Sequence, residues 1–338
     1  MSAATLSWEQ VWNSLGNRAG MDVALRMAMT MQRDARPGVV WFVTRRSTRR
    51  HHLFSPDKQG LVAAIYWFVT AIYARLYGVR VHMVQVMSTH IHEVLTDTKG
   101  NLSRFFELRN AALSRALKVI LPWPEEVLTK TPANWVECPD AATVLHAMAY
   151  TAANCVAAGL VRTPSKWPGA KTLPNEVGKR VIRAKRPAFY FRANNPQWFD
   201  EAELRIEMPA LLEEAYGSQD AARAALAAET AKLVKRAHEK NATTGRGYAG
   251  AKRVIASSHT RRASTRERFG SRNPTFAARG NAELAARLVA RRRAFRAAYR
   301  HAWGEWKRGN RDVVFPFGTY KMRVVYNARC HPPPLAAA

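Results

Sequence analysis

The sequence predicts an α+β protein built around a ferredoxin-like split βαβ unit, in which one antiparallel sheet carries helices on one face. Two observations predict this fold. Between residues 39 and 137, strand and helix patterns follow one another in the order strand, helix, strand, strand, helix, strand. Beyond residue 170 the chain is strongly basic and its longest segments have helical patterns, so a mainly helical extension is expected after the sheet.

The first half of this unit is bounded by residues that break regular structure. Residues Val39–Arg45 are mostly β-branched or aromatic and follow a Pro-Gly pair, which is typical of a strand after a turn. Pro56 to Tyr77 has the composition of a buried helix, and Gly78 is expected to end it. Val81 to Asp97 reads as two strands joined by a tight turn.

The second half has a similar pattern. Leu102 to Ile120 is predicted to be a helix with an apolar inner stripe, and its cations Arg104, Arg109, Arg115 and Lys118 are expected to point outward. Asn134 to Glu137 is the candidate for a fourth strand. Asp140 is a suitable N-cap for a third helix that runs to Ala157 and ends at Gly159.

Two histidines lie in the second strand of the tight turn, in the sequence Thr89-His90-Ile91-His92. Alternate side chains of a strand share a face, so His90 and His92 are expected side by side. Two adjacent imidazoles form half of a divalent-metal site. The alternative is a pair of histidines that face solvent.

The third predicted helix carries Tyr150 and Asn154, four residues apart, so both side chains project from one face. One interpretation is ordinary packing of a tyrosine whose hydroxyl is satisfied. The other makes Tyr150 a nucleophile and Asn154 a third metal ligand, because an amide oxygen suits Mg²⁺ or Mn²⁺ beside two imidazoles.

The charge of the chain points to a polyanionic partner. The 338 residues carry a formal net charge of +28, which favours nucleic acid. The three cysteines are far apart and form neither a zinc motif nor a disulfide framework, so a reducing cytoplasm is expected. No stretch has the length and apolarity of a membrane span, and the N-terminus lacks the pattern of a secretion signal.

Three basic segments are candidates for DNA contact. The first follows the first strand and holds Arg45, Arg46, Arg49 and Arg50. The second holds Arg183, Lys185 and Arg186 beside three aromatic residues at 189–191, which suits either a single strand of DNA or a basic strand whose rings enter a core. The third is a long helix predicted over 281–307, with Arg291, Arg292, Arg293 and Arg296.

Two further expectations concern the extension. Asn241 to Asn273 is rich in Gly, Ser, Thr and Arg and is expected to be disordered until DNA binds. Val313 to Val325 is expected to form a short hairpin.

These motifs together resemble the HUH single-tyrosine transposases, and most of all the REP-associated tyrosine transposases of bacteria. Thr89-His90-Ile91-His92 is similar to the HUH motif of that family, and Tyr150 to Val161 followed by Trp167-Pro168 is similar to its tyrosine helix. Cys155 stands where the family commonly has proline, which leaves the ligands intact. The resemblance covers about residues 39 to 169 and implies three parts: an N-terminal helical extension (1–38), an HUH catalytic domain (39–170) and a basic DNA-binding extension (171–338).

The resemblance implies a metal-dependent DNA transposase. His90, His92 and Asn154 would hold Mg²⁺ or Mn²⁺, and Tyr150 would attack single-stranded DNA near a hairpin or palindromic end to form a 5′-phosphotyrosine link. The expected setting is the bacterial cytoplasm at the nucleoid, with a monomer or a homodimer as the active form. The alternatives are a relaxase or replication-initiator nickase with the same chemistry, and a domesticated protein that only binds hairpin DNA or RNA.

Overall fold

Four antiparallel strands form the central sheet, in the spatial order β2-β3-β1-β4. Their bounds are Val39–Arg46 for β1, Val79–Val86 for β2, His90–Asp97 for β3 and Asn134–Cys138 for β4. This computed structural model describes residues 33–129, 133–195, 197–264 and 274–333. Helix α2 (Leu61–Tyr77) connects β1 to β2 and α3 (Leu102–Ile120) connects β3 to β4, so the predicted split βαβ order is confirmed.

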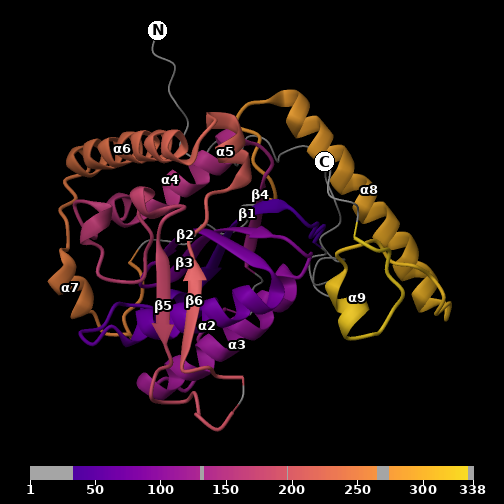
Figure 1. Cartoon of the computed structure of the whole chain (residues 1–338), viewed down its shortest axis with the longest axis horizontal. Helices are drawn as coiled ribbons and strands as arrows, with labels where there is room; N and C mark the ends of the chain where they lie inside the picture. Colours follow the sequence, from indigo (N-terminus) through magenta and orange to yellow (C-terminus); the bar gives the residue numbers. More distant parts are fainter. Residues whose placement is uncertain (1–32, 130–132, 196, 265–273, 334–338) are drawn as a thin grey trace.

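Helices cover both faces of this sheet (Figure 1). α2 and α3 pack together on one face, whereas α4 (Ala141–Ala157) crosses the other face in contact with all four strands. α6 (Gln219–Thr243) packs along the outer side of α4. The expectation of helices on one face alone was therefore too narrow. Both faces of the central strands are apolar, with Val43 and Ile91 buried on the α2–α3 face and Phe42 and Val94 buried on the α4 face.

The boundaries of α2 follow from two residues. Both carboxylate oxygens of Asp57 accept hydrogen bonds from the first turn, at 2.9 Å from the Leu61 nitrogen and 2.8 Å from the Val62 nitrogen. The helix consequently begins at Leu61, after a turn, and not at Pro56 as predicted. Gly78 adopts a left-handed conformation with φ of 66° and ends the helix, as predicted.

Arg109 departs from its predicted outward position on α3. Its side chain is fully buried and forms two hydrogen bonds with the Glu93 carboxylate, at 2.9 and 2.8 Å. The Tyr66 hydroxyl donates to the same carboxylate at 2.6 Å. Its spacing of three or four residues from Phe105, Phe106 and Leu113 puts Arg109 in the middle of the apolar stripe. The buried Glu93 carboxylate supplies the counter-charge that a guanidinium needs there.

The extension begins with a separate two-stranded sheet of β5 (Val181–Lys185) and β6 (Glu201–Arg205), which packs against α2. Phe191 lies in the core between Phe68 and Trp198, with ring centroids 5.0 Å from each. Of the two interpretations for the aromatic residues at 189–191, packing in a core is the one that the structure supports for Phe191.

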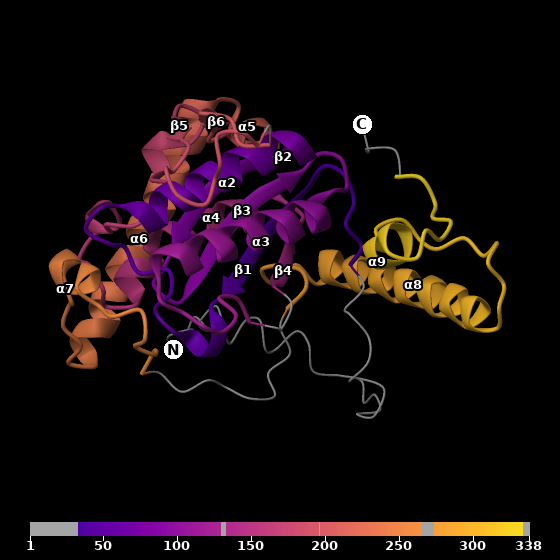
Figure 2. The same ribbon diagram turned by 90° about the horizontal axis from the view of Figure 1, so that it is seen from below.

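The rest of the extension is mainly helical, as predicted. Its helices are α5 (Ala210–Tyr216), α6, α7 (Ala251–Ile255), α8 (Ala282–Lys307) and α9 (Tyr320–Val324). Figure 2 shows α8 and α9 side by side, at the β4 edge of the sheet.

Two expectations for the extension were wrong. Of the segment 241–273 that was expected to be disordered, residues 241 to 264 have defined positions, and 241–243 belong to α6. Residues 265–273 lie outside the described residues. The hairpin expected over 313–325 is absent from this described stretch, because Phe315 pairs with Cys330 while residues 320–324 form α9.

The N-terminal helical extension predicted for residues 1–38 lies largely outside the described residues. Its last part, residues 33 to 38, enters β1 without helical structure. Among the residues that the structure describes, no helix is both long and apolar enough to cross a membrane.

Candidate active site

β3 presents His90 and His92 on the face of the sheet that α4 covers. Their ring centroids are 4.6 Å apart. In the register of β1 and β3, His90 lies opposite Arg46 and His92 lies opposite Thr44. Directly opposed residues point to the same face, so Arg46 and Thr44 share the face of the two imidazoles.

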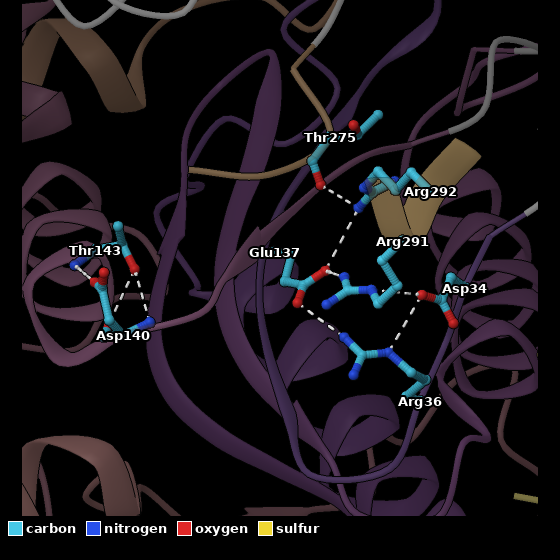
Figure 3. Close-up of polar contacts among 8 residues, drawn as sticks. All are labelled: Asp34, Arg36, Glu137, Asp140, Thr143, Thr275, Arg291 and Arg292. Atoms are coloured by element: carbon cyan, nitrogen blue, oxygen red, sulfur yellow. Dashed lines mark hydrogen bonds and ion pairs between the residues drawn. The ribbon is translucent and has the colours of Figure 1, made fainter. Parts of the chain in front are cut away.

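α4 is held in place at both ends. At its start, the Asp140 carboxylate accepts from the Thr143 nitrogen at 2.8 Å, and the Thr143 hydroxyl lies 3.3 Å from the Asp140 nitrogen, which completes a capping box (Figure 3). After its end, the buried Trp167 indole donates to the Val86 carbonyl of β2 at 3.0 Å. The capping box fixes where α4 begins, and the Trp167 contact joins the segment that follows α4 to the sheet.

Tyr150 and Asn154 meet the two histidines, as the resemblance implied. The Tyr150 ring lies against His92, with centroids 5.6 Å apart and planes at 78°. Phe42 touches both rings, stacking on His92 at 5.3 Å and meeting Tyr150 edge-on at 5.8 Å. The Asn154 side chain lies close enough to His90 to affect the pKa of that imidazole. Four residues separated by as many as 64 positions in the sequence therefore form one cluster.

Two threonines orient the imidazoles. The Thr44 hydroxyl lies 2.9 Å from Nδ1 of His92, and the Thr89 hydroxyl lies 2.9 Å from Nδ1 of His90. When each Nδ1–H donates to its threonine, Nε2 keeps a lone pair for a ligand. Sequence reasoning missed this role for Thr44, because its position opposite His92 depends on the strand register.

Both imidazoles are held in the neutral form. Burial, together with the charge of Arg46, lowers the pKa of His90 to about 4. Burial and the neighbouring His90 lower the pKa of His92 well below its usual value. Neutral imidazole is the form that binds metal, so protons do not compete for these nitrogens near pH 7.

The donor set would suit a hard divalent cation. Two neutral imidazole nitrogens and the Asn154 amide oxygen lie in one cluster, and Nδ1 of each histidine is occupied by a threonine. Among the described residues, no group of three or more His, Cys, Asp or Glu side chains could hold a metal ion. A site here therefore depends on the amide of Asn154 as the third protein ligand.

The arginines of the first basic segment do not all lie on the same face of the sheet. Arg46 and Arg50 lie close enough to His90 for their charge to lower its pKa. Arg49 and Arg50 have positive φ angles of 45° and 57°, a conformation that is rare for residues other than glycine. Arg49 pairs with Glu125 at 3.5 Å. The loop thus brings two guanidinium groups to the candidate site.

Arg45 lies on the opposite face of the sheet from the other loop arginines. It is paired with Ile91 in the register, and its guanidinium donates to the Thr129 carbonyl at 2.9 Å. Strand alternation accounts for this separation from Arg46. The predicted group of four loop arginines is therefore divided, with Arg45 on the α2–α3 side.

A segment of the extension contacts this loop. The His51 ring lies 2.8 Å from the Thr260 carbonyl, and Nε of Arg262 donates to His51 at 3.0 Å. The His52 ring lies 2.8 Å from the Ser257 hydroxyl. Residues 257–263 thus add cations next to the site that the sequence did not assign to it, although the Ser, Thr and Arg composition of this segment was the available signal.

The second basic segment lies away from the candidate site, on β5. Arg183 and Lys185 are exposed but stand opposite Glu203 and Glu201 of β6. Arg186 pairs with Asp200 at 2.5 Å. Each predicted DNA-binding cation of this segment therefore has an acid beside it, which lowers the local potential.

Two arginines of α8 bind acids of β4 and of the segment that precedes β1 (Figure 3). Nε of Arg291 lies 3.1 Å from Asp34, and the Arg291 guanidinium also pairs with the buried Glu137 of β4. Arg292 lies 3.6 Å from Glu137, which Arg36 contacts at 2.9 Å. Both arginines were predicted to bind DNA, but the structure uses them to join α8 to the sheet.

The outer face of α8 carries a separate arginine stripe, which comprises Arg293, Arg296, Arg300 and Lys307. These four side chains are exposed and lie at spacings of three, four and seven residues, so they fall on one side of the helix. Leu284, Leu288 and Ala302 are buried on the other side. From first to last, the stripe spans about 21 Å at 1.5 Å per residue.

Comparisons with known proteins find likeness only among solved structures. No protein-family profile and no curated protein matches the chain. A REP-associated tyrosine transposase bound to a REP hairpin is 18% identical to this chain, with a TM-score of 0.35. The alignment covers 44% of this chain and 85% of that chain. A putative transposase from Deinococcus radiodurans R1 is 16% identical, with 32% of this chain covering 85% of that one at a TM-score of 0.26. Transposases are thus among the structures that this chain is similar to, as the sequence predicted.

Proposed function

We propose that this protein is a single-strand DNA transposase or endonuclease of the HUH single-tyrosine type. Tyr150 is the nucleophile, and His90, His92 and Asn154 are the ligands of Mg²⁺ or Mn²⁺. The observation that carries the proposal is the contact of the Tyr150 ring with His92, with the Asn154 side chain close to His90.

The chemistry is a phosphoryl transfer. The Tyr150 oxygen attacks the phosphorus of the scissile linkage, the bond from phosphorus to the 3′ oxygen breaks, and the products are a 5′-phosphotyrosine and a free 3′-hydroxyl. Attack by a second 3′-hydroxyl reverses the step and rejoins DNA, because the phosphotyrosine retains the energy of the original bond. A bound divalent cation would supply Lewis-acid stabilisation of the charge on the phosphate.

The chain's own residues prepare this step. A phenol has a reference pKa of about 10, so little phenolate exists at neutral pH. The guanidinium groups of Arg46 and Arg50 lie near His90 and would favour the negative charge of a phosphate bound in this region. Phe42 packs against both Tyr150 and His92 and so limits the movement of their rings.

The arginine stripe of α8 is the proposed contact for double-stranded DNA, such as the stem of a hairpin. Four exposed cations on one side of a helix suit the phosphates along a groove of DNA. No acidic residue lies on that side of α8. The REP-associated tyrosine transposase that is similar to this chain is bound to a REP hairpin, which agrees with this choice of partner.

The test is formation of a covalent protein–DNA adduct. Single-stranded DNA that contains a hairpin is incubated with the protein and Mg²⁺ or Mn²⁺ and analysed on a denaturing gel. We expect an adduct with the natural protein, no adduct with Tyr150→Phe or after chelation, and hairpin binding that Tyr150→Phe leaves unchanged. Tyr216→Phe is the matched control, because Tyr216 is an exposed tyrosine on α5.

A second candidate is a protein that binds hairpins without cleaving them. The arginine stripe favours it, since that surface needs no chemistry at Tyr150. Binding without an adduct in either metal would support this second candidate and rule out the first. An adduct that persists in Tyr150→Phe would show that the nucleophile is another residue.

A further inference from the structure

A cavity of about 370 Å³ lies on the side of the sheet away from Tyr150. Its walls come from α3, the start of β4, α9 and the segment that precedes β1. Trp135 and Arg45 line it, and strand register puts both residues on the α2–α3 face. The volume falls in the range of small-molecule sites in proteins, which is about 300 to 1,000 Å³.

The charge of the cavity favours an anion. Arg33, Arg45 and Lys321 line it, against the single acid Glu107. Glu107 already has partners, because it pairs with Arg104 at 2.9 Å and accepts from the Tyr320 hydroxyl. Burial, with the charge of Arg45 nearby, lowers the pKa of Arg33 to about 10. Two partly buried guanidinium groups that repel each other would be stabilised by an anion between them.

The remaining walls favour a flat ring with polar edges. Phe106 and Trp135 contribute aromatic surface, and the Arg33 guanidinium lies 4.0 Å from the Trp135 ring centroid. Two residues that line the cavity carry polar groups suited to the edge of such a ring, the Asn110 amide oxygen and the Trp135 indole nitrogen. One is an acceptor and the other a donor, as the edge of a nucleobase requires.

We propose that this cavity binds a phosphorylated nucleoside, with the phosphate on the cationic side and the base toward Asn110 and the aromatic wall. The nucleotide is either free or part of a DNA strand from which it has been extruded. The site is separate from the proposed chemistry at Tyr150, because the sheet lies between them. Binding there can therefore be tested without any cleavage.

The first experiment measures adenosine 5′-monophosphate binding by isothermal titration calorimetry, beside adenosine and inorganic phosphate. We expect the nucleotide to bind at least tenfold more tightly than either part. Ser103→Trp, which fills the cavity, and Lys321→Glu should each weaken nucleotide binding at least tenfold. Arg323→Glu is the matched control, because it makes the same charge change two residues away on α9 and does not line this cavity.

Two outcomes would overturn the proposal. One is binding of the nucleotide no tighter than phosphate. The other is equal loss of binding in Lys321→Glu and Arg323→Glu, which would indicate only general surface charge. Competition then identifies the source of the nucleotide. A fluorescent hairpin oligonucleotide is bound to the Tyr150→Phe protein, with and without Ser103→Trp, and free nucleotide is added. Release of the oligonucleotide that occurs only without Ser103→Trp assigns the site to DNA. Nucleotide binding without release assigns it to a free nucleotide.

Discussion

Tyr150 of α4 and His92 of β3 lie in contact within one chain, with ring centroids 5.6 Å apart. The helix that carries the tyrosine packs on the sheet of its own chain, and the Trp167 indole after it bonds to β2 of the same sheet. All four residues of the candidate site thus come from one polypeptide, and exchange of tyrosine helices between subunits is not needed to complete it.

The first prediction follows from this arrangement. Tyr150→Phe and His92→Ala should each abolish adduct formation, and a mixture of the two proteins should remain inactive. If subunits exchanged α4, the mixture would contain complete sites and regain up to about half of the activity per pair. Adduct yield on a denaturing gel, measured after unfolding and refolding the two variants together, distinguishes the two arrangements.

The second prediction concerns the buried ion pair behind His92. Glu93→Gln should lower the free energy of unfolding by about 3 to 5 kcal/mol, because it leaves Arg109 buried without its counter-charge. Urea unfolding measures the change. Glu203→Gln on β6, an acid paired with Arg205 at the surface, should cost less than about 1 kcal/mol.

A double variant separates charge from packing at this pair. Glu93→Leu with Arg109→Met removes both charges and should be markedly more stable than Glu93→Gln, since no unpaired charge remains. Equal instability of the double variant and the single variant would show that packing, and not charge, dominates.

The third prediction is a loss of stability in acid that depends on His82. The His82 ring donates from Nδ1 to the Glu207 carbonyl at 2.8 Å, and its Nε2 lies 2.7 Å from the Thr96 hydroxyl. Burial lowers the pKa of His82 to about 4 in the folded state. The unfolded chain, with a histidine pKa near 6.5, therefore binds more protons between these values. The contribution of His82 to the free energy of unfolding is fully present above about pH 6.5. It is lost as the pH drops toward 4, and the loss amounts to about 3 kcal/mol.

Urea unfolding at pH 7 and pH 4.5 tests this directly. His82→Gln should show a smaller difference between the two pH values than the natural protein, by about 2 to 3 kcal/mol. His301→Gln, a change at an exposed histidine of α8, is the control and should keep the full difference. An unchanged acid sensitivity in His82→Gln would contradict the assignment.

The fourth prediction concerns the arginine stripe of α8. A triple variant of Arg293, Arg296 and Arg300 to glutamine should weaken hairpin binding and lower the slope of log affinity against log salt by about 2 to 3, since each phosphate contact contributes about 0.9. Fluorescence anisotropy over a range of salt concentrations measures both. Arg183→Gln with Lys185→Gln on β5 should change the slope less, because each cation stands opposite a glutamate of β6.

Several features of the site could be predicted from the sequence because they depend on local periodicity. The two-residue repeat of a strand sets His90 and His92 on one face, and the spacing of four sets Tyr150 and Asn154 on one side of a helix. Glycine at 78 allows the left-handed turn that ends α2. None of these requires knowledge of what lies across the fold.

Positions that depend on a distant partner could not be predicted in this way. Arg109 and Arg291 share the helical spacing of the buried apolar residues around them, but the carboxylate that each one meets lies on another element of the fold. The division of Arg45 from Arg46 depends on strand register and on which face α4 covers. A charge pattern is the same whether its partner is solvent, DNA or a buried acid.

The sequence by itself therefore determined the order of the strands and helices, the basic character of the chain and the two residue pairs that the proposed chemistry uses. Tertiary structure alone decided that those pairs meet, that Thr44 orients the His92 imidazole, and that some arginines join α8 to the sheet while others remain exposed. The physical reason is that backbone periodicity is local, whereas burial and ion pairing depend on which surfaces the chain brings together.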